Sequence, residues 1–549
     1  MENTPPGTMA DRDRLNRILT LAAVALAGAL LALQLFVPPI VGLADEGDCE
    51  RVMGYAGFRY PTESFDEKYY GHIVAKLSIV SPGWYVSGYL TSETLLAFAA
   101  RGVSLGLFPG RMFDIRILGA IHALLFLAAL GLLVRSCRDL RPAAQVVAAA
   151  LLVLVYTDVG YAAALNSFYA QTASLLFLLL TFACASIGVR NGGLRGLALA
   201  GYFAAAALFV CSKPQEFVHA PLLAVLGVLL AAKSPARRSR LGLALASALC
   251  VLAIWYYRQI PPAGIRHVGL FHTVFHDLLQ YSPDPRRDME ELGIDADLAR
   301  YVGMHAYMAE APIRDPDFQK RFLDRFGYAK VVAFYARHPG RFVDRIRRAA
   351  PAAFRLRPKY LGNFEKSTGV PPRTRATRYA LWSDLRARGE AHALGWLIAF
   401  FGGNLLAAVI AWWKASPRGR FFLLALLAAL LTAALEFGVC AFGDALDDLG
   451  RHLFVVHALC DLVLIADAAW LTQTLASRFA RTALTRASQE FSRPSARSRS
   501  RNAASRPLAR AGSSASASSL AFCTIVTSGK AAHSGIGVVT TGLPPAKYS

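Results

Sequence analysis

The feature that most constrains the fold is a series of apolar runs, each close to the roughly 20 residues that a helix needs to cross a bilayer. The runs are recognised at residues 18–42, 113–134, 143–158, 170–188, 195–211, 217–232, 241–257, 392–413, 421–440 and 453–475. Because helices satisfy their own backbone groups in lipid, the sequence predicts an all-α polytopic membrane protein with about ten transmembrane helices. The fifth and sixth runs are short, and a hairpin that enters the membrane only partly is the alternative there.

Composition excludes a soluble protein of this length. The 549 residues are 55% hydrophobic and only 17% charged, which is far more apolar than the average globular chain. The first run is longer than the apolar core of a signal peptide, and Pro38-Pro39 closes it without a small-residue cleavage site. We therefore expect it to stay in the membrane as the first span.

The net charge of +22 is explained by topology, so nucleic acid is not expected as a partner. Basic segments precede the first span and follow the second, fourth, sixth, eighth and tenth: "DRDRLNR", "RSCRDLR", "RNGGLR", "KSPARRSR", "KASPRGR" and an Arg-rich tail. Short cytoplasmic loops are enriched in Lys and Arg. Both termini, residues 1–17 and 476–549, are therefore predicted to be cytoplasmic, and the Ser-, Arg- and Ala-rich tail is predicted to be disordered.

The same topology places two large segments outside the cytoplasm. Within the first seven spans (18–257), the loop 43–112 contains "TSETLLAFAARGVSLGLF", which is predicted to be a capped helix in the membrane interface because Arg101 is too polar to span. Residues 258–391 show apolar residues at three-to-four spacing and predict a mainly helical extracytoplasmic domain. The last three spans occupy 392–475.

Four acids follow the first span in "ADEGDCER". Asp45, Glu46 and Asp48 are the candidate catalytic residues, because a carboxylate at the membrane surface can take a proton from a hydroxyl or hold a divalent cation. Arg51 is close enough in sequence to orient Asp48 and is a candidate substrate-binding residue. The alternative is a set of solvated acids at a helix end, and Glu50 is assigned to that interpretation.

A second polar group lies in "YTDVGYAAALNSFYAQTAS", between the third and fourth spans. Asp158, Asn166 and Tyr169 are candidate substrate-binding residues, since charged and polar groups at a span boundary often face a cavity. Ordinary turn chemistry and interfacial tyrosines are the alternative interpretation.

A lysine on the outer side is unusual in a chain that keeps its short basic loops inside. Lys213 in "CSKPQEF" could neutralise the phosphate of a membrane-embedded substrate, with Gln215 beside it as a substrate-binding residue. A pair between Lys213 and Glu216, or a snorkelling lysine, is the alternative.

The last span is preceded by "GDALDDLGRHLF". Arg451 and His452 are candidate ligands of a donor phosphate, because a guanidinium binds phosphate through two parallel hydrogen bonds. A salt bridge from Arg451 to Asp447 or Asp448 is the alternative.

Two metal or redox interpretations are less favoured. His272 and His276 at i and i+4 share a helix face and could bind zinc with Asp277 or His267, although structural histidines are preferred. The eight cysteines show no zinc-finger spacing. They are treated as small buried hydrophobic residues, with a disulfide at Cys49 as the alternative.

Taken in order, these motifs resemble the GT-C class of integral-membrane glycosyltransferases, and more specifically the bacterial WsfD-type hexose transferases of glycan biosynthesis. The resemblance covers roughly residues 10–475 and includes "ADEGDCERVMGYAGF", "TDVGYAAALNSFYAQTAS", "SKPQEF", "YVGMHAYM", "FYARHPGRF", "LGNFEKSTG" and "DDLGRHLFVVHALCDL". Gln171 stands where relatives are expected to have an acid, and Cys49 where an aromatic residue is expected.

The resemblance implies an inverting transfer in the bacterial inner membrane, with the bilayer as solvent. Asp45 or Asp48 would deprotonate a glycan or lipid-linked acceptor, which attacks a polyprenyl-phosphate sugar donor. Lys213, Arg451 and, third, His452 would stabilise the leaving phosphate. No cofactor is required, and a divalent metal ion is an option.

Three other functions compete with this one. A lipid-linked glycan polymerase or ligase would use similar chemistry. A polysaccharide transporter or flippase typically carries inverted repeats and mid-bilayer charges, and no repeat is evident here. A structural envelope protein would need no converging polar residues, so it ranks last.

Overall fold

The computed structural model describes residues 9–491, apart from 86, 109, 233–235, 444–445 and 447. The chain divides into two units, Met1–Ser477 and Arg478–Ser549. Every site discussed below belongs to the first unit. Most of the tail predicted at 476–549, and the first residues of the predicted N-terminal segment 1–17, lie outside the described residues.

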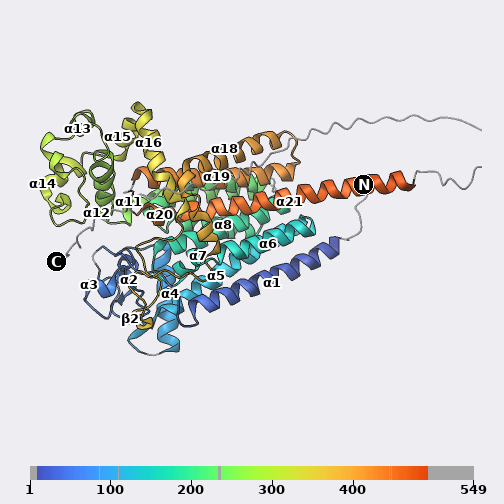
Figure 1. Cartoon of the computed structure of the whole chain (residues 1–549), viewed down its shortest axis with the longest axis horizontal. Helices are drawn as coiled ribbons and strands as arrows, with labels where there is room; N and C mark the ends of the chain where they lie inside the picture. Colours follow the sequence, from blue (N-terminus) through green and yellow to red (C-terminus); the bar gives the residue numbers. More distant parts are fainter. Residues whose placement is uncertain are drawn as a thin grey trace, which may run out of the picture. The chain divides into compact units, whose positions relative to one another are not determined.

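Long apolar helices form the body of the first unit (Figure 1). They are α1 (Met9–Leu35), α5 (Ile115–Ser136), α6 (Pro142–Tyr156), α8 (Ala170–Asn191), α9 (Leu197–Val210), α10 (Ala220–Ala231), α11 (Ala236–Gln259), α18 (Ala393–Trp412), α19 (Pro417–Gly443) and α21 (Phe454–Phe491). Within the described residues, eight helices are long and apolar enough to cross a membrane. A ninth span is present if α6 and the short helix after it, Val159–Leu165, are counted as one bent span. The helix α9 is apolar but shorter. The prediction of an α-helical polytopic membrane protein is confirmed.

Several boundaries differ from the sequence prediction. The last helix, α21, continues to Phe491, so the prediction of disorder from residue 476 is wrong for the first part of the tail. The first helix ends at Leu35 rather than near 42, because Pro38 and Pro39 lack the backbone N–H that a helix needs. The polar stretch after α6 was interpreted as a turn, yet it forms the short helix α7 (Val159–Leu165), bent by 60° from α6. The Asp158 side chain accepts a hydrogen bond from Gly160 N (2.8 Å) and starts this helix in its new direction.

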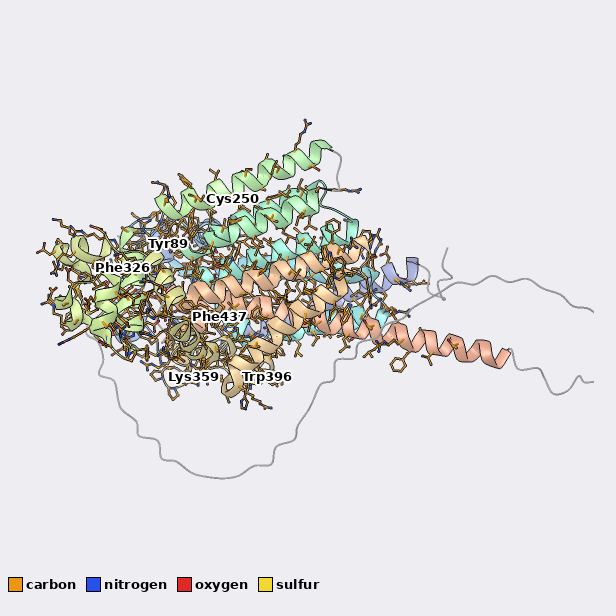
Figure 2. All side chains as sticks on the ribbon, turned by 90° about the horizontal axis from the view of Figure 1, so that it is seen from above. Tyr89, Cys250, Phe326, Lys359, Trp396 and Phe437 are labelled. Atoms are coloured by element: carbon orange, nitrogen blue, oxygen red, sulfur yellow. The ribbon has the colours of Figure 1, made fainter. Side chains whose placement is uncertain are left out.

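The bundle has one deeply buried helix and an apolar outer face. About 83% of the most apolar stretch of α8 is buried inside the protein. The outer helix α18 is mostly exposed. Trp396 on α18 is 57% exposed and lies on the outside of the bundle (Figure 2). Exposed apolar side chains around a bundle are what a lipid-facing surface requires, so the outer face contacts the bilayer.

The first large loop forms a compact unit rather than an extended connection. It contains α2 (Cys49–Ala56), α3 (Phe65–Lys68), α4 (Ser92–Leu107) and the strands β1 (Phe58–Arg59), β2 (Lys76–Ile79) and β3 (Met112–Asp114). The strands make a small antiparallel sheet in the order β1-β2-β3, with Phe58 opposite Ile79 and Leu77 opposite Phe113. Such short strands carry too little alternation to be predicted from sequence.

The helix α4 forms where the capped helix was predicted, and Arg101 explains its position. Arg101 Nη1 donates to the carbonyl oxygens of Ala56 (3.0 Å), Gly57 (3.1 Å) and Val80 (2.8 Å). These bonds satisfy the carbonyls at the C-terminal end of α2. Arg101 therefore connects α4 to the C-terminal end of α2 and to the residue after β2.

The segment 258–391 is mainly helical, as predicted. Its α-helices are α12 (Ala263–Phe271), α13 (Pro285–Leu292), α14 (Pro316–Phe318), α15 (Tyr328–Arg337), α16 (Pro339–Ala349) and α17 (Leu381–Ala387), joined by 3-10 and π-helical turns. It has its own aromatic core, which includes Phe271, Phe275, Phe322 and Phe334. We refer to it as the helical domain.

The first loop and the helical domain lie at the same end of the bundle, and the basic helix ends lie at the other (Figure 1). At that opposite end, Asn16 of α1 donates to Val134 O of α5 (3.1 Å), and Arg190 of α8 donates to Arg135 O (3.1 Å). Successive loops therefore lie at opposite ends of the bundle, and the basic loops share one end, as the distribution of Lys and Arg predicted. Which end faces the cytoplasm stays a prediction.

Candidate active site

The acidic segment, residues 44–51, is fixed to the bundle just after α1. Asn166 Nδ2 donates to Leu35 O (3.0 Å) and Val41 O (2.9 Å), which determines how the chain leaves the helix. Tyr169 Oη donates to Ala44 O (2.9 Å) and accepts from Glu46 N (3.1 Å). Asn166 and Tyr169, both predicted as substrate-binding residues, therefore hold the backbone of the acidic segment in place.

Asp45 is buried and fully used in hydrogen bonds. Its Oδ1 accepts from Gly47 N (2.8 Å) and Cys49 N (3.0 Å), and its Oδ2 accepts from Tyr60 Oη (2.9 Å). Burial raises the pKa of this carboxyl group above its ordinary value, although the backbone hydrogen bonds act in the opposite direction. The contacts of Asp45 shape the turn that leads into α2.

Glu46 and Asp48 instead meet a guanidinium from the far end of the chain. Arg451 lies on the single-turn helix α20 (Leu449–His452). Its Nη2 forms ion pairs with Glu46, with Asp48 Oδ2 (2.9 Å) and with Asp448 Oδ2 (2.5 Å). We call Glu46, Asp48, Asp448 and Arg451 the Arg451 cluster. The salt bridge from Arg451 to Asp448, which was the alternative interpretation of Arg451, is therefore present. Asp447 lies outside the described residues.

The acids of the Arg451 cluster are partly open to solvent. The side chains of Glu46, Asp48 and Asp448 are 12%, 25% and 26% exposed, whereas that of Arg451 is 6% exposed. Burial raises the pKa of Glu46 well above its ordinary value, and the charge of Arg451 opposes this. An exposed carboxylate beside a buried cation is accessible to a substrate hydroxyl.

Asp48 also contacts the helical domain through Arg51. Arg51 Nη1 lies 2.8 Å from Asp48 Oδ1, and Arg51 Nη2 donates to Tyr307 Oη (3.4 Å). Burial alone would raise the pKa of Asp48, but the charges of Arg51 and Arg451 outweigh it and hold this pKa below its ordinary value. Asp48 is therefore an ionised carboxylate between two guanidinium groups.

His452 lies at the edge of the Arg451 cluster. Its Nε2 is 3.2 Å from Asp448 Oδ2 and 3.3 Å from Arg451 Nη2. The residues predicted to be one donor-phosphate pair, Arg451 and His452, are thus neighbours in space as well as in sequence.

A small cavity adjoins the Arg451 cluster. Its volume is about 30 Å³, enough for one or two water molecules. Its polar lining consists of Arg451, Tyr169, Gln171, Arg357 and Asn363, and apolar residues such as Phe454 form the other walls. The Tyr169 ring lies under the Arg451 guanidinium at 5.0 Å. Among the described residues, Arg451 Nη1 and Gln171 Nε2 are buried without a hydrogen-bond partner.

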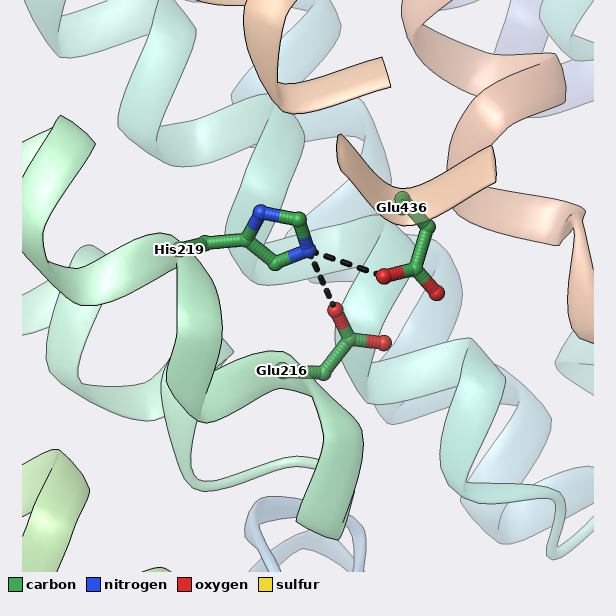
Figure 3. Close-up of side chains that lie close together, drawn as sticks. All are labelled: Glu216, His219 and Glu436. Carbon is green, nitrogen blue, oxygen red and sulfur yellow. Dashed lines mark hydrogen bonds and ion pairs between the residues drawn. The ribbon is translucent and has the colours of Figure 1, made fainter. Parts of the chain in front are cut away.

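Lys213 and Gln215 join a different buried group. Gln215 Nε2 donates to Glu436 Oε1 (2.7 Å) on α19, and Glu436 in turn contacts His219 (Figure 3). Lys213 Nζ is buried and has no hydrogen-bond partner within the described part of the chain. The link to the Arg451 cluster is Cys440, whose Sγ lies 3.3 Å from Glu436 Oε1 and 3.5 Å from His452 O, so its one S–H donates to either acceptor.

Asp158 lies away from the acidic segment and connects two helices. Its Oδ2 accepts from Trp382 N (2.8 Å) and Ser383 N (3.0 Å) at the start of α17, while Oδ1 starts α7. The contacts of Asp158 are therefore those of a double helix cap.

The histidine rings of the helical domain contact one another in tilted and edge-to-face arrangements. The ring centroids of His272 and His305 are 4.2 Å apart, and those of His276 and His305 are 5.1 Å apart. His272 Nε2 accepts a hydrogen bond from Ala306 N (2.9 Å), so this nitrogen is engaged as the preferred structural interpretation expects. Cys49 is buried with a free thiol, so the disulfide alternative is wrong for this residue.

Comparison with known proteins adds a family to this geometry. Residues 9–489 match the family described as the YfdI N-terminal transmembrane domain. The chain belongs to the YfdI family. The family match extends from the start of α1 almost to the end of α21, so the YfdI domain includes the bundle, the acidic segment, the helical domain and the Arg451 cluster. Searches of curated proteins and of solved structures gave no match.

Sequence reasoning assigned no role to several residues that the YfdI fold brings to these clusters. Glu436 lies in the apolar run "AALEFGVCAF", and a charge within a span is a signal that could have identified it. Asp448 was considered only as a competing partner of Arg451. Arg357, in a loop of the helical domain, carries no local pattern that predicts its place beside the cavity.

Proposed function

We propose that this YfdI-family protein is a GT-C-class membrane glycosyltransferase, similar to the WsfD-type hexose transferases. It moves one hexose from a polyprenyl-phosphate donor to a cell-envelope glycan or lipid-linked acceptor. The reaction takes place at the outer face of the bacterial inner membrane, with both termini cytoplasmic. The basic helix ends at the opposite end of the bundle support this orientation.

The observation that carries the proposal is the convergence of an ionised, partly exposed carboxylate with a buried arginine at one bundle end. Asp48 and Arg451 come from segments about four hundred residues apart and meet at 2.9 Å. Transfer from a phosphate ester needs a group that accepts a proton and a cation that stabilises the leaving group. The Arg451 cluster supplies both groups, because the proton acceptor Asp48 and the cation Arg451 are in direct contact.

Asp48 is the proposed general base. It takes the proton of the acceptor hydroxyl, and the hydroxyl oxygen attacks the anomeric carbon of the donor. A new glycosidic bond forms as the bond from this carbon to the phosphate oxygen breaks, with inversion. Asp45 is less suited to this role because its oxygen atoms already accept three hydrogen bonds, and Glu46 holds Arg451 in position.

The negative charge that develops on the polyprenyl phosphate is met by Arg451. Its unpartnered Nη1, together with Gln171 Nε2, offers two donors beside the small cavity. Arg357 lines the same cavity and adds a second guanidinium on the phosphate side of the Arg451 cluster. His452 and Lys213 add positive potential from the neighbouring contacts, and Arg51, which pairs with Asp48, organises the acceptor side.

The test is an assay of the purified protein in liposomes with a single polyprenyl-phosphate hexose and a glycan acceptor. Transfer of one hexose, with release of polyprenyl phosphate, is the expected result. Transfer of a preassembled glycan would support the polymerase or ligase function instead. Movement of the lipid-linked sugar between leaflets without cleavage would support a flippase and contradict the proposal.

A further inference from the structure

A second polar cluster lies inside the bundle, and the proposed reaction does not need it. Glu216 and His219 belong to the 3-10 turn Pro214–His219 that leads into α10, and Glu436 belongs to α19. All three side chains are fully buried. His219 Nε2 lies 2.8 Å from Glu436 Oε2 and 3.4 Å from Glu216 Oε2, so that one nitrogen faces two carboxylates (Figure 3). We call these three residues the Glu-His-Glu cluster.

Their position in the chain makes the cluster unusual. Both carboxylates lie in helices that are long and apolar enough to cross a membrane. Ionisable groups in such segments are costly and are typically found at functional sites. Packing of α10 against α19 could be achieved with apolar residues alone, so the three polar groups need another explanation.

The separations within the cluster suit a coordinated ion. One oxygen or nitrogen atom from each residue lies within 4.8 Å of the other two. For bonds of about 2.0–2.2 Å in a tetrahedral site, ligand atoms are about 3.4 Å apart. The His219–Glu216 separation already has this value, and the His219–Glu436 pair must widen by roughly half an ångström.

Lys213 is a buried cation that interacts with both carboxylates of the cluster. Its side chain is 8% exposed, and its Nζ has no hydrogen-bond partner among the described residues. In this structure Glu216 and Glu436 balance the charge of Lys213. Once a divalent cation takes up these two carboxylates, the charge of Lys213 becomes available for an anion. A buried ammonium group that is neither solvated nor bonded is costly unless an anion pairs with it.

We propose that Glu216, His219 and Glu436 bind one divalent first-row metal ion, Zn²⁺ or Mn²⁺. An imidazole favours Zn²⁺ and carboxylates favour Mn²⁺, so the mixed donor set suits these two ions. Gln215 donates to Glu436 Oε1 and orients this ligand from outside the site. The site is separate from the acidic segment, where Glu46 and Asp48 pair with arginines.

The role of the ion rests on the proposed function, whereas its binding does not. Cys440 connects Glu436 to the backbone of His452, so the ion lies one side chain away from the Arg451 cluster. With Lys213, the bound ion places positive charge beside the region where the donor phosphate is held. The ion thereby strengthens binding of the anionic donor.

Metal binding is measured on the whole purified chain in detergent, first stripped with a chelator and then titrated with Mn²⁺. Counting of free Mn²⁺ by electron paramagnetic resonance is expected to give one bound ion per chain. Glu436→Gln and His219→Asn are expected to weaken binding at least about 100-fold. Loss of a residue that only hydrogen-bonds to a metal ligand already costs about 10–100-fold in affinity. Glu93→Gln is the matched control, because Glu93 and His122 form a similar buried pair (2.9 Å) elsewhere, and it should bind Mn²⁺ normally.

A second measurement needs no substitution. Electron spin-echo spectroscopy of Mn²⁺ bound to the unmodified chain should show coupling to one imidazole nitrogen. Bound Mn²⁺ without nitrogen coupling, or binding that is lost in Asp48→Asn and kept in Glu436→Gln, would place the ion in the acidic segment and overturn the inference. Absence of stoichiometric binding would overturn it as well. None of these outcomes depends on hexose transfer, so failure of the metal site and failure of the proposed function are distinguishable.

Discussion

Two arginine-centred clusters beside α21 differ in how their charges are balanced. In the Arg451 cluster, one guanidinium meets three carboxylates that remain 12–26% exposed. In the second, Arg386 of α17 meets a single carboxylate, Asp461 of α21, at 2.5 Å. The Asp461 side chain is fully buried and also accepts from Tyr161 Oη (2.6 Å) and Trp382 Nε1 (2.8 Å). We call Arg386, Asp461, Tyr161 and Trp382 the Arg386 cluster.

This difference distinguishes a structural carboxylate, Asp461, from one that is available to a substrate, Asp48. Asp461 has a matched charge and donors on both oxygens, so it joins the helical domain to the bundle. Asp48 lies between Arg451 and Arg51 and keeps a quarter of its side chain exposed. A closed pair contributes to stability only as long as both partners stay, whereas an open carboxylate can exchange its contacts with a substrate.

The largest expected effect is on activity in the Arg451 cluster. Asp48→Asn keeps the shape of the side chain and removes its basicity, so hexose transfer should fall by about 10²–10⁴-fold, the range for loss of a general base. The apparent melting temperature should fall only modestly, because Glu46 and Asp448 still pair with Arg451. Both values are measured on the same purified sample, with Glu63→Gln in an exposed ion pair of the same loop as the control.

The converse effect is expected in the Arg386 cluster. Asp461→Asn leaves Arg386 buried without its counter-charge, and removal of one partner of a buried pair costs about 3–5 kcal/mol of folding free energy. Denaturant titration in mild detergent measures this loss, and the protein that remains folded should transfer hexose at a near-normal rate. A stable variant that has lost transfer would instead assign the Arg386 cluster to the chemistry and remove the contrast.

The pH dependence of transfer sharpens the role of Asp48. Its pKa lies below the ordinary value because of Arg51 and Arg451, so it is ionised above the unfolded-state value of about 3.9. Its contribution to stability is present there and is lost only as the pH falls through the lower, folded value. Arg51→Gln should raise the pKa of Asp48 and move the acid limb of the rate profile up by about 1–3 pH units.

The control for this shift is Arg59→Gln, whose partner Glu63 is 68% exposed. Its acid limb should coincide with that of the unmodified protein. An Arg51→Gln profile that also coincides with it would mean that a group other than Asp48 controls the acid limb.

The smallest effect is expected at Asp45. Tyr60→Phe removes one of its three hydrogen bonds, which should cost about 1 kcal/mol of stability and leave transfer within a few-fold of normal. Thermal unfolding and the transfer assay measure the two quantities. A hundredfold loss of transfer at unchanged stability would make Asp45 the base in place of Asp48.

The bundle could be predicted from sequence because hydrophobic runs of spanning length have few alternatives in a bilayer. The bend into α7 could not, because its cause is the capping by Asp158 rather than a change in hydrophobic pattern. The three short strands could not be predicted either, because two to four residues carry no measurable period.

The candidate site was predictable only in part. The acids, Arg451 and Lys213 stand out because charges beside or within apolar runs are costly. The sequence could not pair them, because the contacts of Glu46 and Asp48 with Arg451 join distant segments. Nor could it separate Asp158, whose oxygens cap two helices, from Asp48, whose oxygens face two guanidinium groups.

The most direct test of the central claim is a cryo-electron microscopy structure of the protein with a non-cleavable polyprenyl phosphonate analogue of the hexose donor. The account predicts the phosphonate within hydrogen-bond distance of Arg451, with the anomeric carbon facing Asp48. A phosphonate bound away from the Arg451 cluster, with Asp48 turned from the sugar, would contradict it.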